Sequence, residues 1–195
     1  MASAALRAKQ APLKSTYKSD PAAALITLKS SGTLDASSIT CKLDTGAQLA
    51  KVAGLHAKAG GDGPDISGEL CSGDMLLEAL VACAGVTLKA VATALEIPIQ
   101  SGTVRAEGDL DFRGTMGVDR EAAVGFTAIR LGFEIELAPG TEVEEERIGK
   151  LGKLTERYCV VLQTIVRKPE LSVSVRGTQE TEGGAERSYG WSQKG

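Results

Sequence analysis

The sequence lacks an excess of positive charge, and this limits the partners that it can have. It contains 22 basic and 25 acidic residues, and its formal net charge is −3. No global positive field is therefore available to attract nucleic acid or an anionic membrane surface, and neither is expected as a partner. The longest apolar stretch, residues 75–99, is interrupted by two Glu, one Lys and one Pro, so a buried core helix is favoured over a membrane span.

Cysteine is also scarce. Four cysteines are scattered over the 195 residues, at Cys41, Cys71, Cys83 and Cys159, which is too few for the disulfide scaffold of a secreted protein. No continuous apolar segment follows the basic residues near the amino terminus, as it would in a signal peptide. We therefore expect a cytoplasmic protein whose thiols are reduced.

Metal and nucleotide sites lack their usual residue patterns. No two cysteines have the close spacing of a structural zinc site, and the sequence contains a single histidine, His56. The glycine-rich residues 54–64 do not contain the Lys followed by Ser or Thr that cradles a phosphate. No metal ion and no cofactor are expected.

The sequence has enough apolar residues for one domain, since 43% of its residues are hydrophobic. Residues 1–20 are polar, basic and aperiodic, so we expect a flexible arm. Residues 177–195 are rich in Gly, Glu, Gln and Ser and are typical of a disordered polar tail. The folded domain is expected to span residues 21–176.

The spacing of apolar residues predicts several strands. Residues 24–29 and 38–43 are typical of short strands joined through a Ser-Ser-Gly turn. Apolar and polar residues alternate over residues 104–113 and 129–137, which predicts two long strands of an antiparallel sheet with one solvent-exposed face. Residues 171–175 predict a last strand.

Two helices are predicted between these strands. The first begins at Ser72, whose hydroxyl is placed to cap the first turn, and it stops before Pro98. The second opens with a capping box formed by Thr141 and Glu144. This order of elements predicts an α+β domain with helices packed on one face of a sheet. The first helix is apolar almost all the way round, so we expect a second copy of the chain to cover its free side in a homodimer.

Two of the cysteines lie in the predicted helices. Cys83 lies in the apolar run of the first helix, and Cys159 lies near the end of the second, charged helix. Two thiols from different helices form a redox pair if the fold brings them together. Cys41 and Cys71 are interpreted as structural.

The residues around this pair resemble the OsmC/Ohr family, which includes osmotically induced protein C and the organic hydroperoxide resistance protein. The segment from Ser72 to Cys83 is similar to the family's capped helix leading to Ala-Cys, and Tyr158-Cys159-Val160-Val161 stands where the family commonly has Cys-Pro-Val. The resemblance covers roughly residues 22–176. It implies an OsmC-like fold, in which antiparallel sheets wrap around central helices in an intertwined homodimer, with the cysteine pair near the dimer interface.

The resemblance also implies an activity, the thiol-dependent reduction of organic hydroperoxides or hydrogen peroxide in the response to oxidative stress. In that scheme Cys83 attacks the peroxide and becomes a sulfenic acid, and Cys159 condenses with it to a disulfide. An external dithiol then reduces the disulfide. The peroxide and this dithiol reductant would be the partners of the homodimer.

Three positions depart from the pattern of the hydroperoxidase branches. Gly73 stands where those branches have a Glu, with Asp74 beside it, and Val160 stands in place of Pro. Those branches also use an Arg from an amino-terminal strand, whereas the only Arg before Cys83 is Arg7. The alternative interpretation is a non-catalytic OsmC-like dimer that binds a small apolar ligand at its interface.

A peroxidatic Cys83 must ionise, and its burial in an apolar helix opposes ionisation, so it needs a nearby cation. The candidates are a group of the second subunit or one of His56, Arg105, Arg113 and Arg130. Further supporting residues are expected among Asp74, His56 and Glu78.

Overall fold

The computed structural model describes residues 2–34, 41–43, 53–61, 70–180 and 186–194, and the chain divides into two units. The first unit, Met1–Leu162, contains most of the helices and strands. In chain order these are α1 (Ala2–Ser19), η1 (Pro21–Ala24), β1 (Leu25–Leu34), β2 (Cys41–Leu43), β3 (Ala53–Gly54), η2 (Ala57–Ala59), β4 (Leu70–Cys71), α3 (Ser72–Ala94), β5 (Ile99–Asp111), α4 (Phe112–Thr115), β6 (Phe126–Leu137) and α5 (Glu145–Tyr158). Helix α6 (Val160–Arg167) crosses into the second unit, Gln163–Gly195, which holds β7 (Ser172–Glu180) and β8 (Glu186–Lys194).

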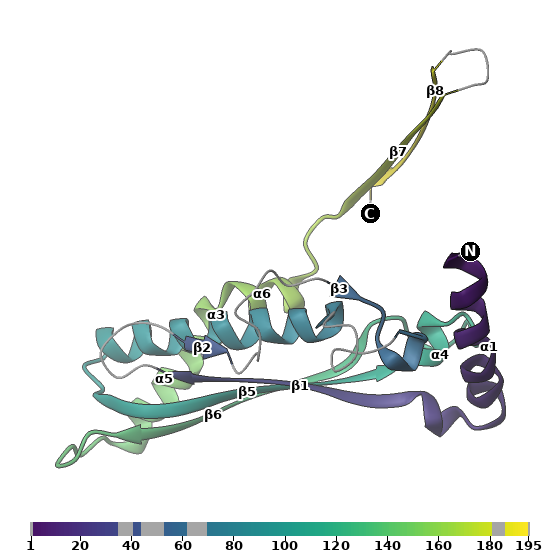
Figure 1. Ribbon diagram of the computed structural model, residues 1–195. Helices are drawn as coiled ribbons and strands as arrows, with labels where there is room; N and C mark the ends of the chain where they lie inside the picture. The colour runs from purple at the N-terminus through teal and green to yellow at the C-terminus, as the bar shows by residue number, and fades with distance from the viewer. Residues whose placement is uncertain (1, 35–40, 44–52, 62–69, 181–185, 195) are drawn as a thin grey trace. The chain divides into compact units, whose positions relative to one another are not determined.

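The first unit is built on an antiparallel sheet with the strand order β2-β1-β5-β6. Helix α3 lies along one face of this sheet (Figure 1) and contacts β1, β5 and β2. Beneath α3, Val104 and Ala106 of β5 are fully buried. The neighbouring side chain Arg105 points to the other face and pairs with Glu134 of β6 at 2.6 Å. The predicted α+β class and the solvent-exposed face of the sheet are therefore confirmed.

Strand β1 differs from the prediction because it does not turn at its Ser-Ser-Gly sequence. Its ladder with β5 continues through Ser31, which pairs with Arg105, and Gly32, which pairs with Val104. The 13-residue strand β5 offers backbone partners along this whole stretch, and these partners override the local turn preference. Of the second predicted strand, residues 38–40 lie outside the described residues, and β2 pairs with the end of β1.

Both predicted helix caps are wrong. Ser72 is the first residue of α3, and the N-cap position belongs to Cys71, which makes no side-chain capping bond. Helix α5 begins at Glu145, and its N-cap Glu144 has extended backbone and no capping bond either. Thr141 therefore lies too far upstream to close a capping box. The predicted end of α3 before Pro98 is confirmed, since the helix stops at Ala94.

The amino-terminal segment is a helix and not the flexible arm that its composition suggested. Helix α1 buries Tyr17, which is 1% exposed and whose hydroxyl donates to the carbonyl oxygen of Lys58 at 2.6 Å. Gln10 donates to the carbonyl oxygen of Ala59 at 3.0 Å. Tyr17 packs with Phe112 in a second hydrophobic cluster of the unit. Leu13 lies one turn before Tyr17 on the same face of α1 and packs against the same cluster, and this packing holds the segment despite its polar composition.

The carboxy-terminal residues also differ from the prediction. The last strand extends from Ser172 to Glu180, and it pairs with β8 in an antiparallel hairpin with nine paired positions. Backbone hydrogen bonds between β7 and β8 thus hold residues that we expected in a disordered tail. Their Gly- and Ser-rich composition did not predict this pairing. All described residues of both strands are exposed. The proposed domain limits of 21 and 176 stay a prediction.

Among the described residues, α3 is the one helix with the length and apolar composition of a membrane span. Core helices of globular proteins share both properties, and more than half of this apolar window is buried inside the protein. The contacts of α3 with the sheet and with α5 agree with a core helix.

Candidate thiol site

The two cysteines of the predicted pair lie where α3 meets the junction of α5 and α6. Cys83 lies in the middle of α3 and is half-buried, whereas Cys159 is fully buried and caps the carboxy-terminal end of α5. Helix α5 packs against α3. The structure brings the two side chains into a hydrogen bond in which the Cys159 thiol donates to the sulfur of Cys83.

The backbone at Cys159 explains why further donors gather at this sulfur. The Cys159 N–H still donates to the carbonyl oxygen of Thr155 at 3.0 Å, but its backbone is extended and ends α5. Helix α6 starts at the next residue, Val160. The first amides of a helix have no partner within that helix. Here the N–H groups of Val160 and Val161 donate to Cys83.

These contacts move the pKa values of the two thiols apart. Burial opposes ionisation of Cys83, but the Val161 amide, the Cys159 thiol, the Val160 amide and the Thr87 hydroxyl together outweigh it, so the pKa of Cys83 lies below its ordinary value. Burial raises the pKa of Cys159, and its interaction with Cys83 raises it further, although hydrogen bonds from the Leu162 and Val161 amides act in the opposite direction. The arrangement therefore favours a Cys83 thiolate beside a protonated Cys159.

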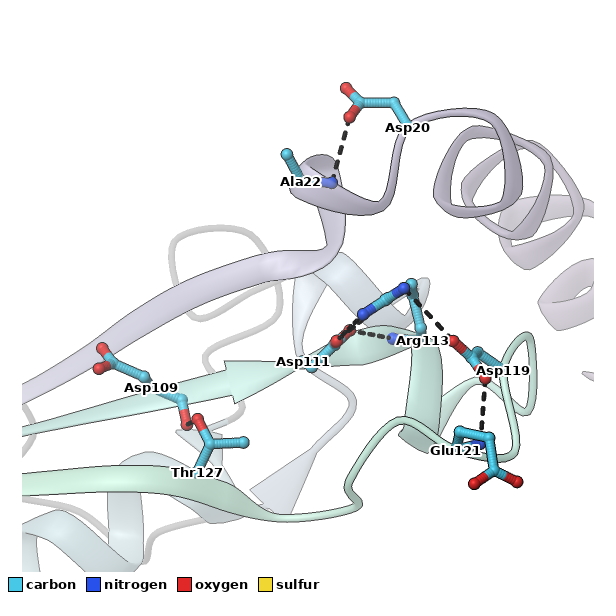
Figure 2. Close-up of polar contacts among 8 residues, drawn as sticks. All are labelled: Asp20, Ala22, Asp109, Asp111, Arg113, Asp119, Glu121 and Thr127. Carbon is cyan, nitrogen blue, oxygen red and sulfur yellow. Dashed lines mark hydrogen bonds and ion pairs between the residues drawn. The ribbon is translucent and has the colours of Figure 1, made fainter.

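Three arginines that were candidates for activating Cys83 are engaged with carboxylates elsewhere. Arg105 pairs with Glu134, and Arg130 pairs with Asp109 at 2.6 Å and with Glu107 at 3.4 Å. Arg113 reaches both Asp111 and Asp119, at 2.6 Å and 3.3 Å, as Figure 2 shows. The same view shows Asp20 capping η1 through Ala22, and Thr127 bound to the backbone of Asp109. None of these three candidate arginines contributes to the pKa shift of Cys83 within the single chain.

His56 does not lie against Cys83 either. Its ring stacks on Phe112 with a centroid distance of 5.1 Å, and its Nδ1 accepts from the Lys58 N–H at 3.0 Å. Burial lowers the pKa of His56, although the nearby Asp74 carboxylate acts in the opposite direction. No cation among the described residues contributes to the ionisation of Cys83. Of the candidates, a cation supplied by a second subunit is the one that the single chain does not test.

The three supporting candidates form a group of their own near the start of α3. Burial raises the pKa of Asp74, and Glu78 adds to this effect while His56 opposes it. Glu78 itself is buried. Asp74 precedes Cys83 by nine residues of helix, a rise of about 13 Å. The structure therefore places Asp74 within electrostatic reach of His56 and Glu78, and none of the three contributes to the pKa shifts of Cys83 and Cys159.

The other two cysteines do not join the pair. Cys71 is a free, half-buried thiol at the N-cap of α3, and the side chain of Cys41 lies outside the described residues. In the part of the chain that the structure describes, no three His, Cys, Asp or Glu side chains gather as metal ligands would.

Sequence reasoning missed the non-cysteine donors at Cys83. Thr87 follows Cys83 by four residues, so the helical period placed it on the same face. The amides of Val160 and Val161 left no trace in the side-chain pattern, because backbone donors are independent of residue type.

These observations define an α+β protein with two hydrogen-bonded thiols where a central helix meets the junction of two others. Comparison with protein families matches residues 60–174 to the family described as OsmC-like protein. This match spans more than half of the chain and includes both cysteines. The chain belongs to the OsmC family. A comparison with curated proteins gave no match.

Proposed function

We propose that the protein is a thiol-dependent peroxidase that reduces organic hydroperoxides or hydrogen peroxide through Cys83 and Cys159. The observation that carries this proposal is the hydrogen bond from the Cys159 thiol to the Cys83 sulfur. A peroxidatic residue must be a thiolate, and its resolving partner must be close and hold a proton for later transfer. Cys83 and Cys159 have these opposite preferences.

The proposed reaction has three steps. The Cys83 thiolate attacks one peroxide oxygen, the O–O bond breaks, and the leaving alkoxide or hydroxide takes a proton, which yields a sulfenic acid and an alcohol or water. The Cys159 sulfur then forms a disulfide with Cys83, and the sulfenic oxygen leaves as water. A dithiol reductant exchanges with this disulfide, restores both thiols and is itself oxidised to a disulfide. This cycle requires a reducing compartment, for which we propose the cytoplasm.

We also propose that the working form is a homodimer. Helix α3 exposes a stripe of small and apolar residues that includes Cys83, namely Leu76, Ala79, Cys83, Val86 and Ala90. The apolar face of β6 is only half-buried, because α3 lies over β1, β5 and β2. An apolar stripe at this helical spacing on a central helix is typical of a surface that packs against another helix. A second copy would supply that helix.

A thiol count tests the peroxidase proposal. Reduced protein is mixed with one equivalent of cumene hydroperoxide, and free thiols and residual hydroperoxide are measured together. We expect the loss of two thiols per chain and a Cys83–Cys159 disulfide in the peptide map. Cys159→Ser should consume hydroperoxide once and accumulate a sulfenic acid that dimedone traps, whereas Cys83→Ser should consume none. An unchanged thiol count with intact hydroperoxide would refute the proposal.

A second candidate is a non-catalytic dimer that binds a small apolar ligand at its interface. It is favoured by the lack of a described cation at Cys83 and by the apolar stripe on α3. Native mass spectrometry of protein purified from cells discriminates between the two. A retained small molecule together with cysteines that do not react with hydroperoxide would support the binding function.

A further inference from the structure

The Thr87 hydroxyl has two acceptors on Cys83 within its reach. Its hydroxyl donates to the carbonyl oxygen of Cys83, with 2.7 Å between Oγ1 and O. The same hydroxyl also lies within hydrogen-bonding reach of the Cys83 sulfur. A threonine hydroxyl has one proton, so it donates to only one of these two acceptors at a time.

The carbonyl oxygen of Cys83 loses little when the hydroxyl turns away. In an α-helix this oxygen already accepts from the backbone N–H of the residue four positions later, which is Thr87 itself. The hydroxyl is a second donor to the same carbonyl. A thiolate, by contrast, is a charged acceptor and gains more from the hydroxyl proton than a carbonyl that is already satisfied.

From this geometry we propose that Thr87 is a switching donor that sets the reactivity of Cys83. While Cys83 is a neutral thiol, the Thr87 hydroxyl donates to the Cys83 carbonyl oxygen. When the thiol loses its proton, the hydroxyl rotates and donates to the sulfur. The Val160 and Val161 amides are held by the backbone, so Thr87 is the donor other than the Cys159 thiol that can turn toward the sulfur when it ionises.

The proposal deepens the proposed function, because it assigns a residue that would stabilise the attacking thiolate. The titratable group that faces this sulfur from α5 and α6 is Cys159, while α3 presents the uncharged Ala79 and Val86 on either side. The pH response of Cys83 therefore depends on Cys159 and on the Thr87 hydroxyl. Replacing Thr87 keeps both thiols, whereas replacing Cys159 removes one of them.

The test is the pH profile of Cys83 alkylation by iodoacetamide, followed peptide by peptide by mass spectrometry. Thr87→Val removes the hydroxyl at nearly constant volume, and we expect the midpoint to rise by about 0.5–1 pH unit. Thr87→Ser keeps the hydroxyl and should restore the wild-type midpoint. Thr93→Val is the matched control, because Thr93 makes the same bond to the Lys89 carbonyl oxygen at 2.8 Å on the same helix.

Two results would overturn the proposal. One is a Thr87→Val midpoint equal to that of the wild type, and the other is a Thr93→Val shift as large as that of Thr87→Val. Circular dichroism and the melting temperature establish that each variant is folded. Alkylation does not involve peroxide, so a Thr87-dependent midpoint in a protein that leaves hydroperoxide intact would support this inference while the proposed function failed.

Discussion

The Cys159 thiol donates a hydrogen bond to the sulfur of Cys83, which links the end of α5 to the middle of α3. The donor is fully buried and the acceptor is half-buried. A reagent from solvent therefore reaches Cys83 before Cys159. The hydrogen bond that stabilises the Cys83 thiolate comes from Cys159, which is also the proposed resolving residue. This asymmetry supports the different roles that we propose for the two cysteines.

The first prediction concerns the order of alkylation. An ordinary thiol is mostly protonated at about pH 7.5. At this pH we expect iodoacetamide to modify Cys83 at least about tenfold faster than Cys159. Hydrogen bonds outweigh the effect of burial at Cys83 and lower its pKa, whereas burial and the interaction with Cys83 raise the pKa of Cys159 against the opposing effect of two backbone amides. Quantitative peptide mapping measures both rates. Equal rates, or faster reaction of Cys159, would contradict this assignment.

The second prediction isolates one backbone donor. Val160 is the first residue of α6, a position that accepts proline, and the extended backbone of Cys159 suits a residue before proline. Val160→Pro should keep the helix, remove the N–H that donates to Cys83, and raise the alkylation midpoint of Cys83 by about one pH unit. Val160→Ala is the control, since the Val160 side chain is 71% exposed and the alanine variant keeps the amide. An unchanged midpoint in Val160→Pro would show that this amide does not act on the sulfur.

The third prediction separates the core face of α3 from its free stripe. Leu80 is 0% exposed, and Leu80→Ala should lower the free energy of unfolding by about 2–5 kcal/mol. Leu76 is 40% exposed, so Leu76→Glu should leave the folded chain intact while placing a charge in the proposed dimer interface. Urea denaturation measures the first effect, and sedimentation velocity measures the second. A Leu76→Glu protein that stays dimeric would argue against α3 as the contact surface.

The fourth prediction concerns acid stability at the end of β5. Arg113 donates to Asp111 and holds the pKa of that carboxyl below its ordinary value, against the opposing effect of burial. A lowered pKa means that this contribution to stability is complete above the unfolded value of about 3.9 and is lost as the pH falls through the folded value. The fall in unfolding free energy between pH 7 and pH 3 should therefore be smaller in Asp111→Asn than in the wild type. Asp20→Asn, which keeps a capping oxygen on η1 (Figure 2), is the comparison.

The fifth prediction compares two glycines. Gly152 is exposed inside α5, and a Cβ there would touch nothing within 4 Å. Gly152→Ala should raise the free energy of unfolding by about 0.5–1 kcal/mol through helix propensity. At Gly114 a Cβ would collide with the carbonyl oxygens of Ala122 and Ala123, so Gly114→Ala should destabilise the protein. Thermal melts of both variants check the opposite signs.

The sequence predicted the elements whose pattern is strong and local. The alternation in β5 and β6 and the apolar run of α3 were visible because each repeats over many residues with one period. The turn expected within β1 was wrong because a neighbouring strand, far along the chain, supplied partners for Ser31 and Gly32. Helix α1 was missed because its order depends on Tyr17 reaching Lys58, which is 41 residues away.

For the candidate site, the sequence by itself identified two cysteines on separate predicted helices as a possible redox pair, and it placed Thr87 one turn after Cys83 without assigning it a role. Only the tertiary structure decided which groups surround Cys83. It directed the arginines to carboxylates on the sheet and gathered Asp74, His56 and Glu78 at the start of α3. It also ended α5 at Cys159, so that the first amides of the next helix donate to the sulfur. Side-chain patterns encode burial and chemistry, whereas the direction of a backbone N–H depends on how helices meet in space.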